Sequence, residues 1–338
     1  MHSADLCHEV LIKNMKPTLA YDETRDFESW REQVRAKFLE LLGDLPSKCS
    51  LYIRVEWEKE HESFYEKRLL FCPEENIDIP CHLWIPKNVK LPCPVVICLQ
   101  GHTTGMHISM GRGVNAGDEV FLGGGRDIAN QAVANGYAAL TMELRGFGEL
   151  KSQLQLNIFP KSISTCAHPS MTANLLGRTL MGERVWDISR AIDMLETMPE
   201  LIDTKKILVT GSSGGGTAAY YAACFEPRIT MAVPCRSICS FKDSIVWRRH
   251  CPCNYIPGIA KYLDMGDLAC LIAPRPLAIV ADVQDNGFHI DGSRKAAATV
   301  QKIYDKVDAS NQFRFLEGQE DQPYYPELSW PVVHELFD

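Results

Sequence analysis

The sequence lacks several features that would place the chain in a membrane or on a nucleic acid. No apolar run is long enough to cross a bilayer. The start, MHSADLCHEV, has no basic segment followed by an apolar one, so we expect no secretory signal and a cytoplasmic location. Positive charge is in deficit, with 35 Lys and Arg residues against 43 Asp and Glu and a net charge of −8. We therefore expect a small-molecule substrate rather than nucleic acid or an anionic membrane surface.

Cysteine is not scarce, but its spacing shows no pairing pattern. The 13 cysteines are odd in number and scattered, and several lie in apolar runs, as Cys98 and Cys224 do. This distribution is typical of reduced, buried thiols. Residues 250–253 (HCPC) differ from the C-x-x-C pattern and have no second cluster at the spacing of a zinc finger. We interpret them as a structural loop and expect neither a metal nor a cofactor.

The strongest motif lies at residues 206–219, which read KILVTGSSGGGTAA. A short apolar run, then a match to G-x-S-x-G, then alanine-rich helix formers indicate a strand, a sharp turn and a helix. This context exposes the central Ser213 at the carboxyl end of a strand and places a helix N-terminus beneath it. We expect Ser213 to be a nucleophile and the Gly214 N–H to stabilise an oxyanion.

Glycine-rich turns between a strand and a helix also bind phosphates or dinucleotides, and the sequence argues against both. No Gly-Lys-Ser/Thr follows the turn, and the glycine order is not G-x-G-x-x-G. A nucleotide-binding oxidoreductase would need that order together with an acidic residue about 20 positions later. The motif therefore favours the turn of a catalytic serine.

Short apolar runs alternate with amphipathic stretches along most of the chain. An apolar run at residues 94–99 predicts a buried parallel strand, and residues 183–198 predict an amphipathic helix. This alternation predicts an α/β fold with a doubly wound, mostly parallel sheet of eight strands and helices on both faces. We expect a single domain over residues 51–338, a helical extension packed on it at residues 1–50, and insertions near 102–126, 150–177 and 236–262.

Four segments carry a resemblance to a known family: Leu99–His102, Arg145–Gly148, Gly211–Gly216 and Ala273–Pro276. Through them, residues 60–338 resemble the acetylxylan esterase and dienelactone hydrolase branch of the α/β-hydrolase fold. The resemblance implies a serine hydrolase of small carboxylic esters, namely acetyl esters or related ones. It also implies a second oxyanion donor, the backbone N–H of His102 or Thr103.

In similar proteins the catalytic acid lies in a D-x-x-F-P element after a late strand, here residues 276–281. Asp285 matches this element, with Phe288 three residues later and His289 where proline is usual. Asp282 is the alternative acid. The resemblance implies that the acid orients a catalytic histidine.

The histidine of the family falls on Gln322, in the turn after the last predicted strand. An amide cannot accept the serine proton at neutral pH, although it can hydrogen-bond to Asp285 and to Ser213. We therefore expect the Gln322 side chain between those two residues. The alternative bases are His334, His102 and His289.

Two functions follow from this substitution, and both stay open at this point. The first is an ester hydrolase whose base has moved to another histidine. The second is a hydrolase-like protein with an impaired triad, which binds a small ligand or carries out a non-esterase reaction. A homo-oligomer is compatible with either. The groups within hydrogen-bond reach of the Ser213 hydroxyl would separate the two functions.

Overall fold

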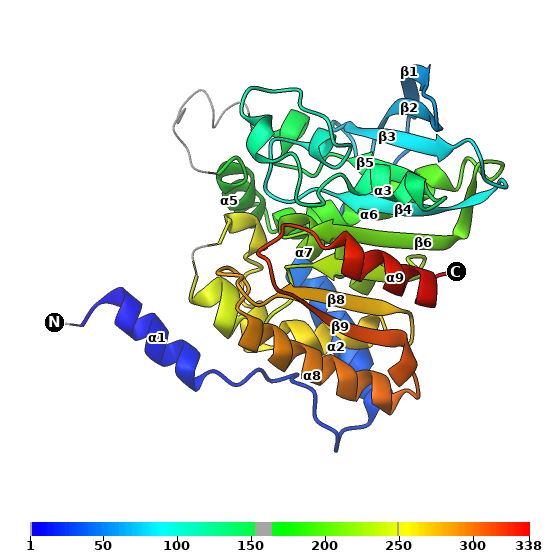
Figure 1. The fold of residues 1–338 in the computed structure, drawn as a ribbon. Helices are drawn as coiled ribbons and strands as arrows, with labels where there is room; N and C mark the ends of the chain where they lie inside the picture. Colours follow the sequence, from blue (N-terminus) through cyan, green and yellow to red (C-terminus); the bar gives the residue numbers. More distant parts are fainter. Residues whose placement is uncertain (1, 153–163, 249) are drawn as a thin grey trace.

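The computed structural model describes residues 2–152, 164–248 and 250–338 (Figure 1). Its strands are β1 Arg54–Glu60, β2 Phe64–Phe71, β3 Ile79–Pro86, β4 Cys93–Leu99, β5 Ala138–Met142, β6 Ile202–Ser212, β7 Met231–Cys235, β8 Leu277–Asp282 and β9 Phe313–Gly318. In the described residues these nine strands form one sheet in the order β1-β2-β3-β5-β4-β6-β7-β8-β9. The sheet has one strand more than the eight expected, and β1 is its exposed edge strand.

Parallel pairing places five loops at one edge of the sheet. From β5 to β9 in the spatial order all neighbours are parallel, whereas β1, β2 and β3 are antiparallel. Ser212 at the end of β6 pairs with Cys235 at the end of β7, and Asp282 at the end of β8 pairs with Gly318 at the end of β9. The loops after these strands and after β4 therefore meet at the carboxyl edge, where open α/β sheets bind ligands.

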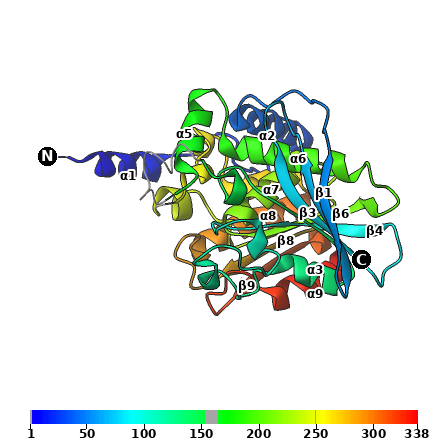
Figure 2. The same cartoon turned by 90° about the horizontal axis from the view of Figure 1, so that it is seen from above.

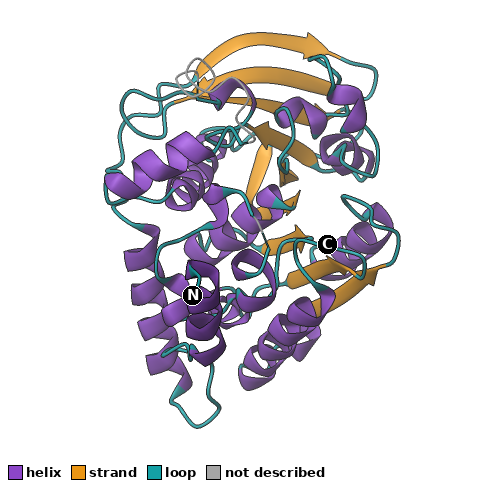
Figure 3. Cartoon of the chain, turned by 90° about the vertical axis from the view of Figure 1, so that its left-hand side faces the viewer, coloured by secondary structure: helices purple, strands orange, loops and turns teal. Residues whose placement is uncertain are grey.

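Helices cover both faces of the sheet (Figures 2 and 3). They are α1 Ala4–Asn14, α2 Phe27–Leu42, α3 Ile128–Ala134, α5 Ala167–Leu175, α6 Leu180–Leu195, α7 Gly214–Phe225, α8 Ile290–Lys306 and α9 Pro326–Leu336. Buried apolar residues of α2, α6, α7 and α8 share one core cluster, and those of α3 and α9 share another. The predicted α/β architecture with helices on both faces is confirmed.

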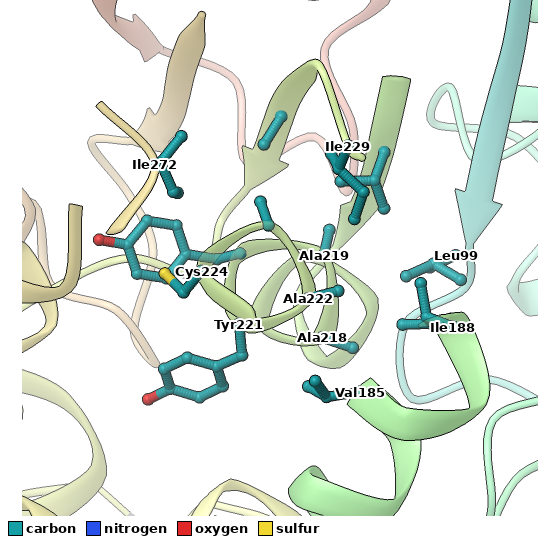
Figure 4. Close-up of a cluster of buried hydrophobic side chains, with 14 of the residues drawn as sticks. Leu99, Val185, Ile188, Ala218, Ala219, Tyr221, Ala222, Cys224, Ile229 and Ile272 are labelled. Carbon is teal, nitrogen blue, oxygen red and sulfur yellow. The ribbon is translucent and has the colours of Figure 1, made fainter. Parts of the chain in front are cut away.

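Helix α7 lies close against the sheet because small side chains line it (Figure 4). Ala218 and Ala222 are fully buried, beside Leu99 of β4 and beside Val185 and Ile188 of α6. Short side chains allow the helix and the strands to approach closely, and interiors at this packing density tolerate few changes of volume. The N-terminus of α7 is thereby held under the end of β6.

The N-terminal segment has two helices that differ in their packing. Helix α2 begins after Asp26, whose carboxylate accepts a hydrogen bond from the Ser29 N–H, and it buries Trp30, Val34 and Phe38 in the core. Helix α1 has no buried residue and stands apart from the sheet (Figures 1 and 2). Among the helices that the structure describes, none combines the length and the apolar character needed to span a membrane.

The expected insertions follow β4, β5 and β7. Residues 102–126 form loops with short 3-10 turns. The stretch 150–177 lies partly outside the described residues, and its described part contains α5. Residues 236–262 include several short helical turns, among them η5 at Pro252–Asn254. None of the 13 cysteines, all of which lie in the described residues, forms a disulfide.

Candidate active site

Ser213 lies on a sharp turn between β6 and α7. Strand β6 ends at Ser212 and α7 begins at Gly214, so this one residue connects the two elements. The Ser213 backbone has φ 53° and ψ −119°, a conformation that residues with a Cβ rarely adopt. Such strain persists only where the surrounding structure enforces it, and it is a feature of functional sites. The backbone has the geometry of a strand-to-helix turn that exposes its central serine.

The loop after β4 lies directly against this turn. A Cβ added to Gly101 would lie 3.5 Å from the Ser213 Cβ, and one added to Gly214 would lie 2.6 Å from His102 Cε1. These glycines therefore allow the two loops to touch, which a larger residue would prevent. The two predicted oxyanion donors, the N–H groups of Gly214 and His102, belong to adjacent segments.

A buried carboxyl group just after β5 holds the loop after β4. The side-chain amide of Gln100 donates to Glu143 Oε2 at 2.9 Å, and the Met106 N–H donates to Oε1 at 3.1 Å. Gln100 Oε1 has no hydrogen-bond partner among the described residues. Burial raises the pKa of Glu143 to about 7, against the lowering effect of the Met106 and Glu149 N–H groups. The protonation of this anchor therefore changes near neutral pH.

We expect the Glu143→Gln variant to gain stability relative to wild type as pH rises. A carboxyl group whose pKa is higher in the folded chain binds more protons folded than unfolded, so the wild type loses stability between pH 4.5 and about 7. The full shift corresponds to about 3 kcal/mol. The introduced side-chain amide can take the place of the protonated carboxyl group. Its NH₂ group would donate to Gln100 Oε1 once the Gln100 amide has rotated by half a turn.

Urea unfolding of both proteins at about pH 5 and about pH 8 measures this difference in the free energy of unfolding. The other titrating groups are the same in both proteins, so their contributions to the free energy of unfolding cancel in the difference. A difference that stays constant between the two pH values would contradict the raised pKa.

A cavity of about 480 Å³ opens where the loops of the carboxyl edge meet, and Ser213 lies in its wall. Two guanidinium groups, of Arg126 and Arg236, also line it. Burial opposes the charge of Arg236, but the hydrogen bond and the charge of Asp285 raise its pKa above the ordinary value. Burial and the neighbouring Arg236 lower the pKa of Arg126, whose hydrogen bond goes to the Phe121 carbonyl. The cavity is therefore polar, and its wall holds two guanidinium groups together with the carboxylates of Asp285 and Asp321.

Asp285 lines the cavity, and Asp282 does not. Asp285 Oδ1 accepts the N–H groups of Gly287 and Phe288 at 2.7 and 3.0 Å, and Oδ2 accepts Arg236 Nε at 2.9 Å. Asp282 is fully buried and accepts the Tyr325 hydroxyl. Of the two predicted acids, Asp285 is the one that faces the cavity.

Gln322 does not lie where the sequence predicted. Its side-chain amide donates to Glu320 Oε2 at 2.9 Å, and its backbone carbonyl accepts a hydrogen bond from Arg236 Nη1 at 2.8 Å. Arg236 takes the place beside Asp285, because a guanidinium binds a carboxylate more strongly than a neutral amide does. Gln322 therefore contacts Arg236 through its backbone and directs its side chain to Glu320.

Of the three alternative bases, His102 lines the cavity, whereas His334 and His289 do not. His334 lies on α9, on the other face of the sheet from α7, and hydrogen-bonds to Asp338 and Asn135. His289 precedes α8, caps it, and has a side chain that is 47% exposed. The His102 ring packs beside the Phe147 ring, and its Nε2 lies 3.2 Å from Cys253 Sγ.

A second histidine of the cavity, His250, was not among the predicted bases. Its Nε2 lies 2.9 Å from the Gly287 carbonyl, which can only accept, so Nε2 carries a proton. In the neutral ring this leaves Nδ1 as an acceptor, at 3.4 Å from Asn254 Nδ2. The only sequence signal for His250 was its place in the HCPC stretch, because its proximity to Asp285 arises from the fold.

The same stretch contributes to a group of side chains that could hold a metal ion, which the sequence did not predict. The ligand atoms of His102, Cys166, Cys251 and Cys253 all lie within 4.8 Å of one another. The interpretation of residues 250–253 as a structural loop rested on the absence of a second cluster at finger spacing. The other two side chains, of His102 and Cys166, come instead from the segments after β4 and β5, far away in the sequence.

Comparisons with known proteins agree with this fold. The sequence profile of the Abhydrolase family matches residues 2–324. The provisionally named hydrolase YtaP of Bacillus subtilis (strain 168) is 24% identical over 294 residues, which cover 85% of this chain and 92% of YtaP. The 4-O-methyl-glucuronoyl methylesterase 1 of Wolfiporia cocos (strain MD-104) is 26% identical over 180 residues, which cover 46% of this chain and 44% of that protein.

A solved structure gives the same result. A provisionally assigned acetyl xylan esterase from Bacteroides fragilis NCTC 9343 superposes with a TM-score of 0.77 at 18% identity, covering 98% of this chain and 85% of the other. The resemblance to acetyl xylan esterases is thereby confirmed for the fold. The chain belongs to the Abhydrolase family and has the α/β-hydrolase fold.

Proposed function

We propose that the protein is a serine hydrolase of small carboxylic esters carried by carbohydrates, with Ser213 as its nucleophile. The observation that carries the proposal is the strained Ser213 backbone, with φ 53°, in the wall of a polar cavity of about 480 Å³. The names of the relatives support the substrate class, since one is named a glucuronoyl methylesterase and another is provisionally assigned as an acetyl xylan esterase.

In the proposed reaction, Ser213 Oγ attacks the ester carbonyl carbon, and a base takes the hydroxyl proton. The backbone N–H groups of Gly214 and His102 hold the oxyanion that forms, because their loops lie side by side. The protonated base then gives its proton to the leaving alcohol. A water molecule, activated by the same base, releases the acyl group and restores the serine.

We assign the role of base to His250. Hydrogen bonding of Nε2 to the Gly287 carbonyl fixes the tautomer that has its lone pair on Nδ1. The acid of a serine triad fixes one tautomer in the same way, but it binds Nδ1–H and leaves the lone pair on Nε2. The 3.4 Å contact from Asn254 to Nδ1 is long and easily exchanged for a contact with a serine hydroxyl. His250 and Ser213 line the same cavity, which supports this assignment.

Asp285 acts in this scheme as a positioning residue. Its Oδ1 accepts the Gly287 N–H, and the Gly287 carbonyl accepts His250 Nε2. The carboxylate thus orients the His250 ring indirectly, through the backbone of Gly287, and does not bind the ring itself. Arg236 neutralises the same carboxylate through Oδ2.

The polar groups of the cavity fit a sugar-bearing ester better than a simple alkyl ester. Arg126 has no described carboxylate as an ion-pair partner, and its guanidinium donors suit hydroxyl groups or a uronic acid carboxylate. Thr103, Ser109 and Asn254 add hydroxyl and amide groups to the wall. Sites with a few convergent polar groups of this kind select their ligand by hydrogen bonding.

Labelling with a fluorophosphonate, which reacts with activated serines, tests the nucleophile. Mass spectrometry of the digested protein is expected to find the adduct on Ser213. Turnover is measured on acetylated xylo-oligosaccharides, on a methyl ester of glucuronic acid and on p-nitrophenyl acetate. A folded protein that takes no label on Ser213 and cleaves none of these esters would contradict the proposal and favour ligand binding.

We expect His250→Ala to lower kcat by about 10²- to 10⁴-fold, since this is the usual contribution of a general base. KM should change far less, because the imidazole moves a proton and does not hold the substrate. His289→Ala is the matched control, since His289 lies outside the cavity. Equal kcat values for His250→Ala and wild type would show that His250 is not the base.

A further inference from the structure

We propose that His102, Cys166, Cys251 and Cys253 bind one zinc ion beside the active-site cavity. The proposal does not depend on ester hydrolysis. The four side chains come from three separate parts of the chain, namely the loop after β4, the start of α5 and the η5 turn. Each offers one ligand atom, and the four atoms lie within 4.8 Å of one another.

The chemistry and the geometry of the group suit zinc. Three thiolates and one imidazole form a common structural zinc site, with tetrahedral bonds of about 2.3 Å to sulfur and about 2.0 Å to nitrogen, so that its sulfurs lie about 3.8 Å apart. The observed spacing needs a contraction of at most about 1 Å to reach that geometry. Soft thiolates with one imidazole disfavour magnesium and calcium, which prefer oxygen ligands.

A buried cation gives independent support. Arg184 is fully buried, and its Nη2 lies 3.2 Å from Cys166 Sγ. It also interacts with the Cys253 side chain, and its remaining contacts are neutral, namely the Arg145 carbonyl and the Phe147 ring. A buried guanidinium needs a negative charge nearby. A zinc ion with three thiolates and a neutral imidazole carries one net negative charge, which Arg184 balances.

The surroundings hold the ligands in place from outside. The Ser164 hydroxyl lies 3.1 Å from Cys251 Sγ, and the Phe147 ring packs edge-on against the His102 ring at 4.9 Å between centroids. Ligands of structural sites are usually oriented by such outer contacts. All four positions of the tetrahedron are taken by the protein, so the ion would be structural and not a Lewis acid for the substrate.

The orientation of His102 links this site to the serine turn. Nε2 lies 3.2 Å from Cys253 Sγ, whereas Nδ1 lies 2.7 Å from the place of a Cβ on Gly214. Zinc bound at Nε2 leaves the proton on Nδ1, on the side of the serine turn. The ion would thereby fix the loop that carries the His102 backbone N–H.

The metal content of the tag-free protein, purified after growth with zinc, tests the proposal. Mass spectrometry of the metals is expected to find roughly one zinc per chain. The Cys251→Ser and Cys253→Ser variants should bind zinc more than about 100-fold more weakly, since even outer contacts are worth 10- to 100-fold. Cys49→Ser is the matched control, because Cys49 is half-buried like Cys251 but lies outside the cluster, and it should retain its zinc.

A ligand variant can lose its fold, so the wild type gives a second readout. After removal of zinc and addition of Co²⁺, the visible spectrum should show the strong bands of tetrahedral thiolate coordination. Ser213→Ala should keep its zinc, which separates this proposal from the proposed reaction. Reduced wild type without zinc and without such a cobalt spectrum, or a disulfide among the three cysteines, would overturn it. Equal zinc affinity in Cys251→Ser would overturn it too.

Discussion

Replacing Ser213 with alanine is expected to lower kcat for carbohydrate esters by roughly 10⁴- to 10⁶-fold. The alanine cannot form the acyl intermediate, so the remaining rate would come from the oxyanion N–H groups and from substrate binding alone. The backbone turn should survive the change, because alanine has the same Cβ constraint at φ 53° as serine. KM should therefore stay within a small factor of the wild-type value.

Steady-state kinetics on an ester that the wild type cleaves measures this effect, with circular dichroism to show that the variant is folded. Ser310→Ala is the control, since Ser310 lies before β9 and hydrogen-bonds to Asp305 away from the cavity. A Ser213→Ala enzyme with more than about a tenth of the wild-type kcat would rule out Ser213 as the nucleophile.

Replacing Gly215 with alanine is expected to destabilise the protein by about 3 kcal/mol or more. The added Cβ would lie 2.4 Å from the Leu99 carbonyl oxygen and 2.5 Å from the Gln100 carbonyl oxygen. Both atoms belong to the backbone at the end of β4, which cannot move without shifting the sheet. Alanine favours a helix over glycine by about 1 kcal/mol, so the clash outweighs the gain in propensity.

Thermal unfolding measures this loss, and we expect Tm to fall by at least about 5 °C. Gly113→Ala is the matched control, because its Cβ would meet nothing closer than Leu122 Cδ1 at 3.4 Å and its φ is not in the left-handed region. If Gly215→Ala unfolds at the same temperature as Gly113→Ala, the close contact between α7 and β4 is not what holds the serine turn.

The parts of the fold that the sequence predicted are those with local patterns. The apolar run at residues 94–99 predicted a strand, and the G-x-S-x-G motif predicted a strand-to-helix turn. The structure confirms both elements, and the end of β4 pairs with the end of β6 beside that turn. Asp285 was predicted as the acid from the family element after β8 and its spacing to Phe288, and the structure places it in the wall of the cavity. Patterns of this kind depend on neighbours within a few residues, which a sequence shows directly.

The groups that the sequence missed are brought together over long distances along the chain. His250 reaches the cavity because the insertion after β7 folds back over Gly287, and no spacing rule relates the two. The cysteine cluster joins two insertions and the loop after β4. Gln322 was assigned by aligning the turn after β9 with the family's sequence pattern. Such an alignment does not show that Arg236, from another loop, binds Asp285. Long-range contacts of loops carry no local periodicity, which is why function concentrates where prediction is weakest.

The anchoring of the turn after β9 determines how many substitutions are needed to place a histidine of this turn beside Asp285. The Tyr325 hydroxyl accepts the N–H groups of Glu320 and Gln322, and Arg236 binds the Gln322 carbonyl. A histidine introduced at position 322 would inherit a backbone that is fixed on both sides and a side-chain direction that leads to Glu320. Arg236 would have to change first, and the loss of Arg236 alone would leave Asp285 without its cation. Bringing a histidine of this turn to Asp285 therefore needs at least two substitutions, one at position 322 and one at Arg236.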